Sequence, residues 1–156
     1  MEKESLELKI EKEKIKKRRM DILCESIIKF TEKEEESAWI PDFESGELWK
    51  KTTMKRRKLL NTISGILRTN VDITVDEICG MLLSRHGEER VIKGLREILF
   101  ESREDVKRFA LQVLERIGTE EAADAIEDAC DWETKDEMII EMHRAIEQIL
   151  DKLKEE

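Results

Sequence analysis

Proline, glycine and tyrosine are scarce in this chain of 156 residues, which has one proline, six glycines and no tyrosine. Charged residues make up 43% of the chain and hydrophobic residues 39%. So few helix breakers in so charged a sequence favour helices, and the composition excludes a β-sandwich, a collagen-like repeat and a disulfide scaffold. We therefore expect an all-α protein with a length typical of one domain.

Long apolar runs are also missing. The longest have three residues, as in Met81–Leu83, which is too short to cross a bilayer. The first residues, MEKESLELKIEKEK, carry too many charges for the apolar core of a secretory signal. We expect a cytoplasmic protein that does not enter a membrane.

Motifs for catalysis, metals or cofactors are absent from the sequence as well. Cys24, Cys79 and Cys130 form no C-x-x-C pair, and each lies in a helical pattern that predicts a small core residue. His86 and His143 belong to neither H-E-x-x-H nor Glu-x-x-His, and no glycine-rich phosphate loop occurs. We assign no catalytic, metal-binding or cofactor-binding residue and expect no enzyme.

The clearest boundary in the chain lies near residues 37–45, where Pro41 forces the residue before it out of helical geometry. The charged residues 1–36 before it predict one long helix, whose apolar stripe of Leu8, Ile15 and Ile22 recurs every seven residues. Residues 37–70 predict an aromatic linker followed by an amphipathic basic helix that ends near residue 68.

Residues 71–156 predict short helices joined by tight turns. Thr74 and Glu77 have the spacing of a capping box, and Gly87 and Gly118 stand where a helix end needs a left-handed residue. The predicted helices cover roughly residues 75–85, 88–100, 103–117, 120–131 and 135–153.

The apolar positions of these helices repeat along the chain. Val91, Leu95 and Ile98 recur 31 residues later as Ala122, Ile126 and Ala129. With a shift of 32 residues, Val106, Ala110, Leu114 and Ile117 recur as Met138, Met142, Ile146 and Ile149. A period of this length built from two helices is typical of a helical solenoid.

The middle unit resembles a known family. Val106-Lys107-Arg108, Ala110, Leu114, Ile117-Gly118, Glu121-Ala122, Ile126, Ala129 and Asp131 follow the pattern of the HEAT-like repeat first described in bilin lyases. The flanking units match through apolar spacing, and Cys79-Gly80 replaces the basic residues of the motif. The resemblance implies a short HEAT-like helical solenoid with additional N-terminal helices. It also implies an interaction scaffold rather than lyase chemistry.

Charge divides the chain into two unlike halves. Residues 1–70 hold 17 Lys and Arg against 14 Asp and Glu, whereas residues 71–156 hold 12 against 24. Eleven of the 17 cations lie in two basic tracts, residues 14–19 and 50–58. Such tracts bind phosphates or acidic proteins, or they form ion pairs on a solvated helix face. The partner-binding candidates of the first tract are Lys14, Lys16, Lys17, Arg18 and Arg19.

The predicted helix over residues 120–131 carries carboxylates and no cation. We predict that the first basic tract docks on this acidic face, within one chain or from a second copy, unless a basic partner takes its place. The candidate residues are Glu120, Glu121, Asp124, Glu127 and Asp128.

Three of the seven aromatic residues, Trp39, Phe43 and Trp49, fall within eleven positions. They form either an exposed docking patch or a plug for the open end of the solenoid, and the need to cap such an end favours the plug. From these features we expect a non-enzymatic scaffold that binds a protein partner. The alternative is a nucleic-acid-associated module that uses the two basic tracts.

Overall fold

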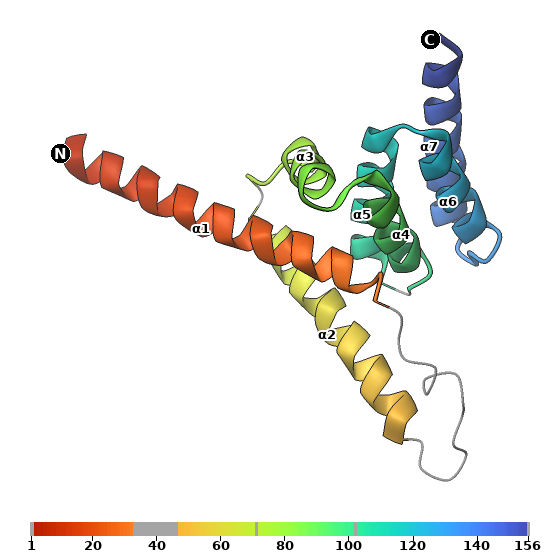
Figure 1. The fold of residues 1–156 in the computed structure, drawn as a ribbon, viewed down its shortest axis with the longest axis horizontal. Coiled ribbons are helices and arrows are strands. Elements are labelled where there is room, and N and C mark those ends of the chain that lie inside the picture. The colour runs from red at the N-terminus through yellow and green to blue at the C-terminus, as the bar shows by residue number, and fades with distance from the viewer. Residues whose placement is uncertain (1, 33–46, 71, 102, 156) are drawn as a thin grey trace.

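The computed structural model describes residues 2–32, 47–70, 72–101 and 103–155, and this part of the chain is all-helical (Figure 1). The expectation of an all-α protein is therefore confirmed. The helices in these residues are α1 (Glu2–Lys29), α2 (Glu47–Thr69), α3 (Val75–His86), α4 (Glu88–Leu99), α5 (Glu104–Ile117), α6 (Glu120–Cys130) and α7 (Asp136–Glu155).

The predicted capping box before α3 and the two predicted glycines at helix ends are confirmed. The Glu77 N–H donates to the Thr74 hydroxyl at 3.2 Å, and the Thr74 N–H donates to the Glu77 carboxylate at 3.3 Å. This capping box begins α3. Gly87 and Gly118 follow α3 and α5 with φ angles of 81° and 67°, a region that favours glycine.

The first helix is shorter than the predicted helix over residues 1–36. It ends at Lys29, and Phe30, Thr31 and Glu32 follow in a turn whose N–H groups donate to carbonyls three residues back. The Phe30 ring in this turn is buried, and burial of so large an aromatic ring stabilises the turn. Residues 33–36 lie outside the described part of the chain.

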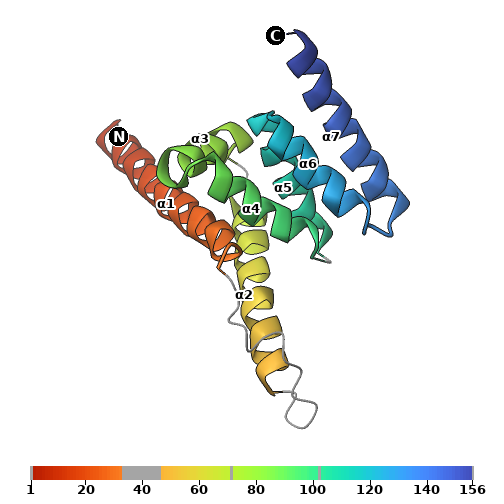
Figure 2. The ribbon, with the colours of Figure 1, turned by 45° about the vertical axis from the view of Figure 1, so that its right-hand side comes forward.

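From α3 onward, each helix contacts the next helix and the next but one. As a result, α3, α5 and α7 form one layer and α4 and α6 form the other (Figure 2). α1 packs across α3 and α4 at the end of the stack opposite α7, and α2 packs against α1 and α5. The N-terminal halves of α1 and α2 extend beyond the stack in both views (Figures 1 and 2).

The positions that recur in the sequence lie in the core between these layers. Leu114 and Ile126 have no exposed side-chain surface, and the other recurring positions are buried except Ile117 and Ile146, which are partly buried. Cys24 and Cys79 are also buried, and burial raises the pKa of the Cys24 thiol to about 11. These two cysteines are core residues, as their helical setting predicted.

The backbones of α1 and α4 approach closely at Gly94. A Cβ atom added there would lie 2.8 Å from the carbonyl oxygen of Ile27 and 3.2 Å from the Thr31 methyl carbon. The first distance is a clash with the backbone of α1, which a rotamer change cannot relieve. Gly94 therefore allows α1 to lie directly on α4.

A buried ion pair joins α5 to the turn before α7. Lys107 Nζ lies 2.7 Å from Glu133 Oε2, and neither side chain is more than 9% exposed. Burial raises the pKa of the Glu133 carboxyl, but hydrogen bonds from Lys107 and from the backbone N–H groups of Lys135 and Thr134 outweigh it. The pKa of Glu133 is consequently below its usual value.

We predict that Gly94→Ala destabilises the protein by about 1–3 kcal/mol, the usual effect of overpacking. Gly80→Ala is the matched control, because a Cβ atom at this exposed helical position meets nothing within 4 Å. Alanine should stabilise that site by roughly 0.5–1 kcal/mol. Urea unfolding of both variants measures the difference. A Gly94→Ala variant as stable as the wild type would contradict close packing of α1 on α4.

We predict that Glu133→Gln destabilises the protein by about 3 kcal/mol at neutral pH, because it leaves the Lys107 ammonium buried and unpaired. Since the pKa of Glu133 is lower in the folded state, its contribution is present above the unfolded pKa of about 4.3 and is lost as the pH falls through the folded value. The unfolding free energies of the two proteins should therefore converge in acid. A difference in unfolding free energy between the two proteins that does not change with pH would show that the charge of Glu133 does not contribute to stability.

Candidate functional site

The first basic tract lies where α1 leaves the stack. Lys16 Nζ is 3.0 Å from Glu77 Oε2 of α3, and Arg19 donates 2.8 Å hydrogen bonds to the side-chain oxygens of Thr69 and Asn70. The hydrogen bond between Lys16 and Glu77 raises the pKa of the lysine and lowers the pKa of the glutamate. Two cations of this tract thus hold α1 against the end of α2 and the start of α3.

The other three candidates of the tract face solvent. Lys14, Lys17 and Arg18 are exposed, and none of them has an ion pair or hydrogen bond within the described part of the chain. They are the cations of residues 14–19 that are available to a partner.

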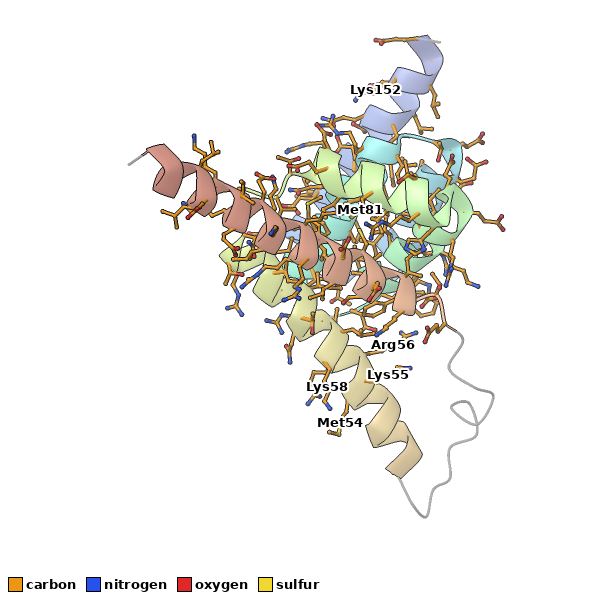
Figure 3. All side chains as sticks on the ribbon, turned by 60° about the vertical axis from the view of Figure 1, so that its left-hand side comes forward. Met54, Lys55, Arg56, Lys58, Met81 and Lys152 are labelled. Atoms are coloured by element: carbon orange, nitrogen blue, oxygen red, sulfur yellow. The ribbon has the colours of Figure 1, made fainter. Side chains whose placement is uncertain are left out.

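The second basic tract divides in the same way. Arg56 lies 3.1 Å from Glu101 and 3.8 Å from Glu97 of α4, and its guanidinium stacks 5.7 Å from the centre of the Phe30 ring. Lys58 is exposed on the opposite side of α2 (Figure 3). Lys50 and Lys51 belong to α2, but their side chains lie outside the described part. Arg56 therefore fastens α2 to the stack, whereas Lys58 does not.

The acidic candidates Glu120, Glu121, Asp124, Glu127 and Asp128 are all exposed on α6. Asp128 pairs with Arg96 of α4 at 3.2 Å. The predicted docking of the first basic tract on this face within one chain is wrong for the described residues, because α1 packs on α2, α3 and α4 and does not contact α6. Docking from a second copy or a foreign partner stays a prediction.

The aromatic candidates Trp39 and Phe43 lie outside the described residues, so the predicted plug stays a prediction. Trp49 belongs to the first turn of α2. The structure adds Trp132, which sequence reasoning did not single out. It lies in the turn after α6 and is 78% exposed.

An open groove of about 550 Å³ lies between the projecting half of α1 and α3. Its floor, which we call the groove floor, consists of Leu6, Ile10, Met20 and Met81. Charged side chains form its rim: Lys9, Glu13, Lys14, Lys16, Lys17 and Glu77. The Met81 side chain projects from α3 toward α1 (Figure 3). The groove thus brings two cations of the first basic tract that lack an internal partner, Lys14 and Lys17, next to an apolar surface.

The sequence analysis singled out three of the four lysines of this groove, Lys14, Lys16 and Lys17, but neither Lys9 nor the groove floor. The apolar stripe that the sequence pattern showed is Leu8, Ile15 and Ile22. It lies on the side of α1 away from the groove, where all three residues are exposed. Leu6 and Ile10 lie one turn apart, on the face that buries Cys24 and Ile27 further along. Charged residues at positions 13 and 17 interrupt that face and hide its continuity.

Other functional features are few among the described residues. A second hollow of about 650 Å³ beside Thr31, His86 and Lys93 has charges of both signs and no apolar floor. No group of three or more His, Cys, Asp or Glu side chains in these residues is placed to hold a metal ion. None of the described helices is both long and apolar enough to span a membrane.

No protein-family model matches the chain, and no curated protein or solved structure matches it significantly.

Proposed function

We propose that this chain is a non-enzymatic scaffold, a short HEAT-like solenoid whose N-terminal end is capped by α1 and α2, and that it binds a protein partner. The contacts from α3 to α7 support the solenoid, because helices in such a stack contact only their near neighbours. Two ion pairs add support. Arg96 pairs with Asp128, and Arg108 pairs with Glu141 at 3.1 Å, so each pair links helices about one sequence period apart.

The groove between α1 and α3 is the observation that carries the protein-binding function. Leu6 and Ile10 are 62% and 48% exposed, and they line an open groove together with Met81, which is partly buried, and Met20, which is buried. An exposed apolar patch with a charged rim is typical of a protein interaction site. The three free cysteines support a cytoplasmic location, because a reducing compartment keeps thiols unpaired.

A nucleic-acid-associated module is the second candidate. The observation that favours it is the set of exposed cations on α1 and α2, which includes Arg18, Arg57 and Lys58. Two observations weigh against it. The net charge is −9, and Lys16, Arg19 and Arg56 have partners within the chain. A protein-binding function therefore explains the exposed side chains of α1 and α2 better than a nucleic-acid-binding function does.

We expect affinity capture with the full chain to retain a protein after nuclease treatment, and the complex to re-form from purified components. The purified chain should show no binding to duplex or single-stranded DNA at about 50 mM salt, where phosphate contacts are strongest. The nucleic-acid candidate replaces the scaffold if DNA binds and the combined change of Lys14, Lys17 and Arg18 to Gln reduces its salt dependence. Lys16 and Arg19 are left unchanged because they hold α1 in place.

A further inference from the structure

We infer that the groove between α1 and α3 binds an acidic amphipathic helix of the partner protein. The apolar face of that helix would lie on the groove floor, and its carboxylates would face the lysines of the rim. This inference rests on the proposed function and names the chemistry of the partner.

The groove floor continues a helix-packing surface that the chain uses elsewhere. Between Met20 and Ile28, α3 and α4 cover the inner face of α1 and bury it. Toward the N-terminus the same face continues through Ile10 and Leu6, where no described helix covers it. A helix laid beside α3 would extend the packing by further turns, which is the helix-in-groove mode of recognition.

The methionines of the groove suit an incoming helix. Met81 is only partly buried, and its unbranched, polarizable side chain adjusts to the shape of the apolar residues that meet it, whereas Met20 is buried and closes the inner end of the groove. Leu6 and Ile10 supply the fixed branched surface one helical turn apart. The groove therefore selects for apolar side chains at helical spacing rather than for a flat surface.

The rim selects for negative charge on that helix. Four lysines face two glutamates around the groove, and Glu77 is already paired with Lys16 at 3.0 Å. Lys9, Lys14 and Lys17 therefore outnumber Glu13, the one carboxylate of the rim that has no ion pair in the described part of the chain. Complementary charge speeds association and fixes the orientation of the bound helix.

The acidic helix α6 of a second copy fits the groove less well than such a partner helix. The acidic face of α6 offers the carboxylates, but α6 buries its apolar residues, such as Ile126 and Ala129, against the rest of the stack. It would therefore reach the lysines without covering the groove floor. A partner helix that presents both apolar and acidic side chains satisfies the whole surface.

The test uses the full chain and a fluorescent synthetic helix of about five turns, with Leu at positions i, i+3, i+4 and i+7 and Glu on the other face. A twin peptide carries Lys in place of each Glu. By fluorescence anisotropy, we expect the acidic peptide to bind at least about tenfold more tightly than its twin, and the advantage to shrink as salt is raised.

Two matched pairs of variants locate the site. Leu6→Glu should weaken binding of the acidic peptide at least about tenfold, whereas Leu8→Glu should not, because both leucines are about equally exposed (62% and 61%) but only Leu6 lines the groove. Lys17→Glu should weaken binding in the same way, whereas Arg18→Glu should have little effect, because Arg18 does not line the groove. All four side chains are exposed, so the fold should tolerate each change.

Any one of four results would overturn the inference. The first is equal affinity for the acidic and basic peptides, and the second is equal loss of affinity in Leu6→Glu and Leu8→Glu. The third is self-association in sedimentation velocity that Leu6→Glu abolishes, which would make a second copy the occupant. Fourth, if the reconstituted partner binds Leu6→Glu and Lys17→Glu as it binds the wild type, the scaffold proposal stands and only the groove assignment fails.

Discussion

Gly94 lets the backbone of α4 approach Ile27 of α1 at a distance that leaves no room for a Cβ atom. This close approach lays the second half of α1 across the end of the helix stack and buries Leu23, Cys24 and Ile27 there. Because α1 is a long helix held at one half, its other half must extend past the stack beside α3. The open groove with its apolar floor is a consequence of that overhang.

Electrostatics divides the amino-terminal cations into two groups with different roles. Lys16, Arg19 and Arg56 bind groups on α2, α3 and α4, so they fix the position of α1 and α2. Each such exposed or half-exposed pair contributes only about 0–1 kcal/mol to stability. Apolar burial therefore supplies most of the stability, and the pairs determine how α1 and α2 are aligned on the other helices. The cations that remain, above all Lys14 and Lys17, surround the groove, where they add selectivity for negative charge.

Most of the helices were predictable because the signals for a helix come from residues that are close together in the sequence. Apolar spacing predicted the buried positions of α4 to α7, and Thr74, Gly87 and Gly118 marked helix ends through chemistry that involves only nearby residues. The end of α1 was missed because the Phe30 ring is buried after folding and contacts Arg56 of α2, which is distant in sequence. Docking of residues 14–19 on α6 within one chain was wrong because charge complementarity does not determine which helices are neighbours. The groove was missed because Met81 joins Leu6 and Ile10 only after folding.

Amide hydrogen exchange along α1 in the full chain tests most directly whether one half of this helix is held by the stack and the other is not. We expect the amides of residues 20–29 to exchange only through global unfolding, because this segment is packed under α3 and α4. The amides of residues 6–15 should exchange through local opening with a much smaller free energy. Equal protection along the whole helix, whether uniformly low or uniformly high, would contradict an overhanging α1 that forms an open groove.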